Sequence, residues 1–291
     1  MMRVRWKLWL KWMYLVFGLG AATAAYMGLS FEEYTRDSDL QQYMNDAGAN
    51  AQVIGKGLPY DARIIRVQNR DSIRPLLIFV HGAPGSGMAF ERYIRDPDLL
   101  ERFDMIALDR PGYNRNQPYN TYRFDLQVNF LNALIEQYSL PGQSLYFVSH
   151  SYGGPLCILS AESTKRVAGH IMLSPVIHAG TEPVFFVSPL PLIWPFAFIS
   201  SPAMRFSAVE KLNHQRELIK HFAELYEKGT HAVSTWLVHG VKDWLAPMAN
   251  VDASQGIVDP NMYHEVLFQD ASHFIPWTRY EEIKSLIMEL P

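Results

Sequence analysis

The stretch from residue 145 to 155 constrains the fold of this chain more than any other. It begins with an apolar run typical of a buried strand, and small residues then lead into a helical pattern. A serine at such a junction, Ser151, is presented at the tip of a tight strand-to-helix turn. The backbone there is strained, so the residues two positions away must be small, and they are Ser149 and Gly153. The usual pattern has glycine in place of Ser149, so the match is close but incomplete.

Strand-like and helix-like patterns alternate on both sides of this stretch. The other expected strands are 63–67, 76–81, 105–109, 170–173, 235–239 and 266–268, and the expected helices include 125–140, 155–164 and 280–290. Strands that alternate with helices form a parallel sheet covered by helices. The sequence therefore predicts an α/β fold with a mostly parallel central sheet, in a domain covering residues 62–291.

The alternation stops between residues 178 and 232, where we expect a small cap inserted after the sixth strand. Residues 183–204 carry no charge. The prolines at 189, 191 and 195 argue against a second membrane helix, because each removes a backbone donor that lipid cannot replace. Residues 209–227 have the pattern of an amphipathic helix. The large apolar side chains expected to form a lid over the substrate are Phe185, Phe186, Leu190, Trp194, Phe196 and Phe198.

The N-terminal segment, residues 1–31, has the pattern of a membrane anchor. Four cations up to Lys11 precede an uncharged run over residues 12–31, which as a helix spans about 30 Å, the thickness of a bilayer core. The cationic flank predicts a cytoplasmic N-terminus and an exported domain, periplasmic or extracellular. A cleaved signal ending near Ala22-Thr23-Ala24, which would release a secreted protein, and a buried or amphipathic helix are the alternatives. Residues 32–61 are polar and irregular and are expected to form a linker and lead-in.

Charge and cysteine content exclude several classes of partner. A net charge of −3 gives no reason to expect nucleic acid. Cys157 is the single cysteine, so an intrachain disulfide is impossible and thiolate metal sites are excluded; we expect it to be a core residue. None of the ten histidines falls into a ligand-spaced cluster with carboxylates, so no metal site is predicted.

Three polar residues follow strands at the sheet edge where a site is expected. A serine hydroxyl needs a base to attack a carbonyl, and that base needs an acid to hold its tautomer. The carboxyl ends of parallel strands meet at one edge, where Asp243 and His273 follow the last two strands and Ser151 follows an earlier one. We therefore predict Ser151 as nucleophile, His273 as base and Asp243 as acid.

Rivals for the acid and the base are few. The loop after strand 170–173, where some hydrolases place the acid, contains no carboxylate. His150 adjoins the serine but is expected to point away from its hydroxyl, and His239 lies at a strand end, where structural histidines are common. The full set of rivals for the base is His150, His178, His239 and His264. Charge on the reacting carbonyl oxygen must be met by backbone N–H groups, and we expect Ala83 and Tyr152 to supply them.

Five motifs in this order resemble those of the α/β-hydrolase superfamily, over about residues 62–291. They are His81–Gly85, Asp109–Tyr113, Ser149–Gly153, His239–Asp243 and Ser272–Phe274. Ser149 departs from the family pattern, and so do Asn114-Arg115-Asn116, where relatives often carry glycine and serine. The serine nucleophile disfavours relatives that open epoxides or displace halides.

The resemblance and the residues together imply a serine hydrolase that cleaves a carboxylic ester or thioester of small-molecule type, with a hydrophobic acyl group suggested by the cap. An amide, an N-terminal proline peptide or a carbon–carbon bond are alternative targets. A non-enzymatic relative that binds a ligand is the alternative of another class. The chemistry requires no cofactor or metal, and the sequence does not indicate an oligomeric state.

Overall fold

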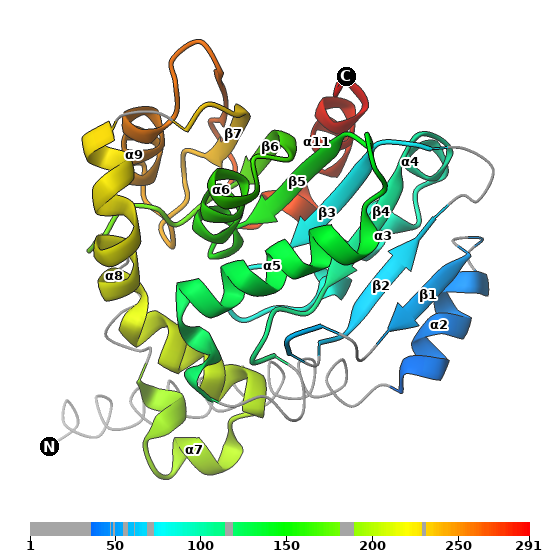
Figure 1. The fold of residues 1–291 in the computed structure, drawn as a ribbon. Coiled ribbons are helices and arrows are strands. Elements are labelled where there is room, and N and C mark those ends of the chain that lie inside the picture. The colour runs from blue at the N-terminus through cyan, green and yellow to red at the C-terminus, as the bar shows by residue number, and fades with distance from the viewer. Residues whose placement is uncertain are drawn as a thin grey trace, which may run out of the picture.

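The computed structural model describes residues 36–46, 48, 50–54, 58–60, 62–68, 73–113, 119–180, 189–228 and 231–291. Its centre is an eight-stranded sheet in the order β1-β2-β4-β3-β5-β6-β7-β8 (Figure 1). The strands are β1 Ala51–Ile54, β2 Ile64–Val67, β3 Leu76–Val80, β4 Asp104–Leu108, β5 Leu145–His150, β6 Val167–Leu173, β7 Ser234–Gly240 and β8 Tyr263–Phe268. Only the β1–β2 and β2–β4 pairs are antiparallel. The predicted α/β fold with a mostly parallel sheet is confirmed.

Helices cover both faces of this sheet, because the central strands are apolar on both sides. The helices are α2 Asp37–Asp46, α3 Glu91–Ile94, α4 Pro97–Arg102, α5 Phe124–Tyr138, α6 Gly153–Thr164, α7 Phe196–Ile199, α8 Pro202–Lys228, α9 Ala249–Ile257, α10 Ile275–Thr278 and α11 Tyr280–Met288, with short 3₁₀ turns η1 Gly87–Phe90, η2 Tyr119–Tyr122 and η4 Leu190–Leu192. Alternate residues of β3 point to opposite faces. Ile78 and Val80 pack with α5, α6, α8 and α9, whereas Leu77 and Phe79 pack with α2, α3, α4 and α11.

The folded region begins earlier than the predicted domain start at residue 62. Within the expected linker, α2 forms a helix and β1 pairs with β2, with Ala51 opposite Val67. An ion pair of 3.0 Å between Asp37 and Arg63 joins α2 to the chain entering β2. The pattern was missed because β1 has four residues and α2 buries only Leu40 and Met44, too few apolar positions to mark a periodic pattern.

The predicted membrane anchor, residues 1–31, lies outside the described residues. Among the residues that are described, no helix combines the length and the apolar character needed to cross a membrane.

The cap lies between β6 and β7, as predicted, and contains η4, α7 and α8 (Figure 1). Its main element, α8, has 27 residues and starts at Pro202, earlier than the amphipathic pattern indicated. Leu218 and Phe222 of α8 join the core on the face covered by α5 and α6. The second half of the cap is therefore part of the folded domain.

The turn between β5 and α6 shows why its residues are small. Ser151 has φ of +52°, in the left-handed region that L-residues avoid. A Cβ added at Gly153 would lie 2.5 Å from the Val80 carbonyl oxygen, so α6 can pack against the end of β3 only with glycine there. Ser149 is tolerated in place of the usual glycine, because its hydroxyl lies 2.7 Å from Nε2 of His170 on the neighbouring strand.

We expect Gly153→Ala to lower the free energy of unfolding by about 1–3 kcal/mol, since β3 must shift to admit the methyl group. Gly256→Ala is the matched control: this α9 glycine has open space at its Cβ position, and alanine there should stabilise the protein by up to ~1 kcal/mol. Denaturant unfolding followed by circular dichroism measures both. Equal effects at the two positions would contradict this account of the turn.

Candidate active site

A pocket of about 400 Å³ opens at the carboxyl ends of the central strands. Ser151 lies in it at the end of β5, and His273 reaches it from the loop after β8. The loop after β3, residues 81–86, forms one wall, and Lys211 of α8 is the cap's contribution. The remaining lining residues are Met88, Ala89, His150, Val176, Leu245, Phe274 and Trp277. The predicted nucleophile and the predicted base thus share one pocket.

Asp243 lies behind His273 and away from the pocket. Its Oδ2 is 2.8 Å from Nδ1 of His273, while its Oδ1 accepts the backbone N–H groups of Leu245 at 3.0 Å and Ala246 at 2.8 Å. A carboxylate at Nδ1 holds the proton on that nitrogen, which leaves Nε2 of His273 with its lone pair available to a hydroxyl. The three predicted residues are therefore gathered at one edge of the sheet, and all three are buried.

The charge state of Asp243 suits this arrangement. Burial alone would raise the pKa of its carboxyl group, but the hydrogen bond and charge of His273 and the backbone N–H of Ala246 together hold the pKa below its ordinary value. Asp243 is consequently an anion at neutral pH.

The rival histidines have other contacts. His150 directs Nε2 to the His273 carbonyl oxygen at 3.0 Å, and burial lowers the pKa of its imidazole to about 3. Nε2 of His239 lies 2.8 Å from the Ala246 carbonyl oxygen, in the Asp243 loop. His264 stacks on Trp236 of the neighbouring strand. His150 and His239 thus support the loops that carry His273 and Asp243. A structural role was expected for His239 from its place at a strand end, but not for His150.

The loop after β3 packs directly against the turn between β5 and α6 that carries Ser151, here named the elbow. A Cβ added at Gly82 would lie 2.9 Å from Cβ of Ser151, so only glycine fits there. Ala83, the next residue, lines the pocket. Within the described part of the chain, neither the Ala83 nor the Tyr152 backbone N–H donates a hydrogen bond. Both predicted oxyanion donors are therefore unpaired beside Ser151.

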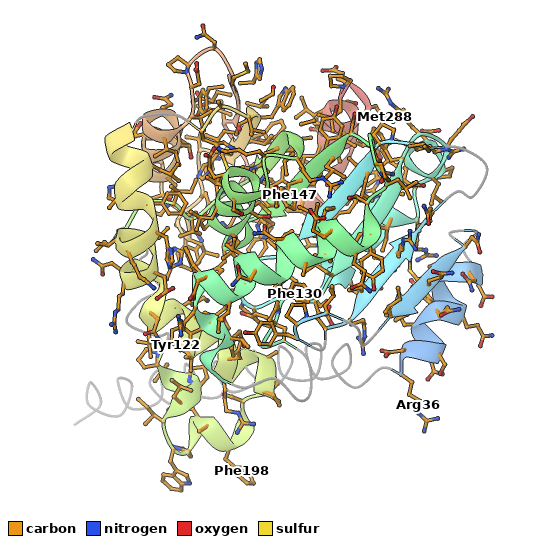
Figure 2. The ribbon with its side chains drawn as sticks, in the orientation of Figure 1. Arg36, Tyr122, Phe130, Phe147, Phe198 and Met288 are labelled. Atoms are coloured by element: carbon orange, nitrogen blue, oxygen red, sulfur yellow. The ribbon has the colours of Figure 1, made fainter. Side chains whose placement is uncertain are left out.

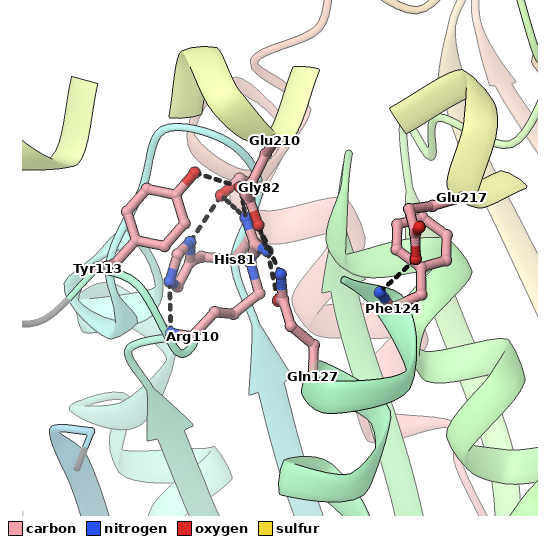
Figure 3. A network of polar contacts seen from close by, with 8 residues as sticks. All are labelled: His81, Gly82, Arg110, Tyr113, Phe124, Gln127, Glu210 and Glu217. Carbon is pink, nitrogen blue, oxygen red and sulfur yellow. Dashed lines mark hydrogen bonds and ion pairs between the residues drawn. The ribbon is translucent and has the colours of Figure 1, made fainter. Parts of the chain in front are cut away.

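A buried polar network centred on Arg110 and Glu210 lies beneath this loop (Figure 3). The Arg110 guanidinium meets the Glu210 carboxylate at 2.7 and 3.0 Å, with 1% and 0% of the side chains exposed. It also donates to the carbonyl oxygens of His81 and Gly82, both at 3.0 Å. Tyr113 and Gln127 donate to the same carboxylate. The network joins the cap helix α8 to the loop that carries Ala83.

Sequence reasoning singled out Arg110 within the motif Asp109–Tyr113 but missed Glu210. No local pattern identifies this glutamate, because it lies on an amphipathic helix one hundred positions from its partner. A second cap carboxylate, Glu217, accepts the Phe124 backbone N–H at the start of α5 at 2.8 Å (Figure 3). It was missed for the same reason.

The predicted lid residues do not line the pocket. Leu190, Trp194, Phe196 and Phe198 are exposed, Trp194 at 83% and Phe198 at 87%. Phe185 and Phe186 lie outside the described residues. The prediction that the four described residues cover the substrate is corrected: all four are exposed outside the pocket, because α7 stands away from the sheet, with Phe198 at the edge of the molecule (Figures 1 and 2).

One group of possible metal ligands occurs among the described residues, away from the pocket. Asp125, Glu217 and His221 each offer an atom within 4.8 Å of the others. Arg123 already pairs with Asp125, and Glu217 already accepts the Phe124 N–H.

Comparisons with known proteins agree with the observed fold. The family model described as alpha/beta hydrolase fold matches residues 75–198. Protein phosphatase methylesterase 1 from Candida glabrata is 30% identical over 128 residues, which are 37% of this chain and 33% of that protein. This chain thus spans about a third of the length of that relative.

Two solved structures share the fold at low identity. Epoxide hydrolase A from Mycobacterium thermoresistibile has a TM-score of 0.63 at 15% identity, covering 82% of this chain and 97% of its own. A bacterial membrane phospholipase A has a TM-score of 0.62 at 15% identity, covering 97% of each chain. The chain thus has the fold of the α/β hydrolases, and the family model of that fold matches its residues 75–198.

Proposed function

We propose that this protein is a serine hydrolase that cleaves a carboxylic ester or thioester through an acyl-enzyme. The observation that carries the proposal is the shared pocket of Ser151 and His273, with Nδ1 of His273 held 2.8 Å from Asp243. A positioned nucleophile, a base and an orienting acid are the parts that acyl transfer needs.

The proposed reaction follows from these positions. His273 accepts the Ser151 proton at Nε2 as Oγ attacks the carbonyl carbon, and the anionic oxygen is met by the N–H groups of Ala83 and Tyr152. His273 then returns the proton to the leaving oxygen or sulfur atom, which leaves an acyl group on Ser151. Water, deprotonated by His273, attacks this acyl group and restores the serine. Asp243 stabilises the imidazolium in both steps.

The pocket supports a hydrophobic acyl group. Its walls away from the elbow are largely apolar, with Leu245, Phe274 and Trp277 among them. Lys211 is the only lysine or arginine among the described lining residues. A methylesterase and a phospholipase among the similar proteins agree with an ester substrate. An amide, an N-terminal proline peptide or a carbon–carbon bond remain the alternatives for this site.

Two further parts of the proposal concern location and class. We propose that residues 1–31 anchor the protein in a membrane with the hydrolase domain exported; signal cleavage with secretion is the alternative, decided by the mass of the mature protein. The alternative of another class, a non-enzymatic ligand-binding protein, predicts a pocket without a reactive serine.

A fluorophosphonate probe tests the proposed nucleophile. Wild-type protein should be labelled at Ser151, and Ser151→Ala should lose labelling, because Ser151 is the proposed nucleophile and shares the pocket with His273. Ser86→Ala is the matched control, since Ser86 lines the same pocket outside the elbow and its loss should leave labelling intact. Absence of labelling on folded wild-type protein would favour the ligand-binding alternative.

A further inference from the structure

The first half of the cap presents an exposed apolar surface, here named the cap face. It is formed within η4, α7 and the turn between them by Leu190, Leu192, Ile193, Trp194, Phe196 and Phe198. Trp194 and Phe198 are the most exposed, and Phe198 points outward from the edge of the molecule in Figure 2. Six neighbouring apolar residues of this size are unusual on a water-exposed surface and mark an interaction site.

The composition of the cap face matches a lipid surface. No lysine, arginine, aspartate or glutamate occurs between residues 183 and 204, so the segment that forms the cap face carries no charge. Trp and Phe side chains on a short projecting segment insert readily at the boundary between head groups and acyl chains. Three prolines prevent this segment from forming a spanning helix, so it can dip into one leaflet without crossing the bilayer.

The short stretch of chain between the predicted anchor and the described residues also indicates a lipid bilayer. Four residues separate the end of the predicted anchor at Phe31 from Arg36, where the described chain begins, and fully extended they reach only ~14 Å. Arg36 and Phe198 both lie on the lower side of Figure 2, whereas Met288 lies on the upper side. An anchor of this length would therefore bring the side that carries the cap face to the bilayer surface.

We propose that the cap face docks on the lipid bilayer and that the hydrolase takes its ester substrate from the membrane. Uptake of the substrate from the membrane rests on the proposed function, whereas docking of the cap face does not. The cap face leads directly into α8, whose Lys211 lines the pocket nine residues after Pro202, or about 14 Å along the helix. Docking would thus place the pocket close to the surface from which a lipid ester could enter.

Site-specific fluorescence in vesicles tests the docking. Full-length protein carrying Phe198→Cys labelled with an environment-sensitive dye is reconstituted into phosphatidylcholine vesicles; Cys157→Ala removes the buried native thiol. A doxyl group on the lipid acyl chains should quench the dye at residue 198. The control is Glu289→Cys, an exposed position next to Met288, which lies on the opposite side in Figure 2; its dye should show no quenching. An unquenched dye at 198, including one shielded by the N-terminal segment or by a second copy of the chain, would overturn the proposal.

Activity measurements test the uptake of substrate from the membrane separately from the docking of the cap face. Trp194→Ser combined with Phe198→Ser should reduce the hydrolysis of a phosphatidylcholine-embedded ester roughly tenfold through KM, because two inserting side chains are lost. Hydrolysis of a short soluble ester should stay unchanged, since neither side chain lines the pocket. Equal rates of wild type and the double variant on the embedded ester would refute uptake from the membrane. Lack of activity on both esters in wild type would refute the proposed function and leave the quenching result valid.

Discussion

Replacing His273 with alanine should lower kcat/KM for a carboxylic ester by on the order of 10⁶-fold, with the protein still folded. The expectation follows because the other two histidines among the described lining residues have other contacts. Nε2 of His81 accepts the Arg110 backbone N–H, whereas His150 is engaged with a backbone carbonyl, and burial lowers the pKa of the His150 imidazole to about 3. Asp243→Asn should cost less, about 10⁴-fold, since it disturbs the tautomer of His273 without removing the base. Steady-state kinetics on a chromogenic ester measure both effects.

Two controls make this prediction specific. His264→Ala removes a rival histidine on β8. Its ring stacks on Trp236, which lies well before Asp243 in the chain, so the activity of this variant should match that of the wild type. His273→Ala with near-normal activity would show that another group serves as base. A larger effect of Asp243→Asn than of His273→Ala would contradict the assigned order of roles.

Glu210→Ala should destabilise the protein by about 3–5 kcal/mol. This is the largest stability effect that we expect from any single substitution in the cap. The loss leaves the Arg110 guanidinium buried without its counterion, and it removes the acceptor for Tyr113 and Gln127. Denaturant unfolding followed by circular dichroism measures the change. Glu281→Ala is the matched control, because it breaks an exposed ion pair with Arg92 and should cost less than ~1 kcal/mol.

Glu210→Ala should also slow catalysis. Arg110 donates to the carbonyl oxygens of His81 and Gly82, so a displaced Arg110 moves the loop that positions the Ala83 N–H. We expect kcat to fall while KM changes little, since the loss concerns a donor that acts in the transition state. Similar costs for Glu210→Ala and Glu281→Ala would show that the buried pair is not needed for the fold.

Most of the sheet was predictable because its strands are continuous apolar runs that end in turn residues. β3 and β5, buried on both faces, gave the clearest signals. α2 and β1 were not predictable, since a short edge strand and a helix with two buried residues leave almost no periodic pattern. Their positions depend on pairing with β2, which is information that local sequence does not contain.

The gathering of Ser151, Asp243 and His273 was predictable because each follows a strand of one parallel sheet. The supporting residues were not. Glu210 acts through contacts across the fold, and nothing in its neighbouring sequence separates it from an ordinary helix residue. His150 was considered only as a rival base, and its contact with the His273 carbonyl oxygen could not be read from the motif. The orientation of the cap face was mispredicted for a related reason: an apolar sequence indicates burial against something, without indicating whether that is substrate, protein or lipid.

The ion pair between Arg110 and Glu210 divides the inserted segment into two parts with different freedom to vary. Residues after Pro202 are fixed by a buried charge that tolerates few replacements, whereas those before it touch neither the network nor the pocket in the described part of the chain. Substitutions ahead of Pro202 could therefore change the surface that the cap presents, while the frame that aligns the reacting groups is left unchanged.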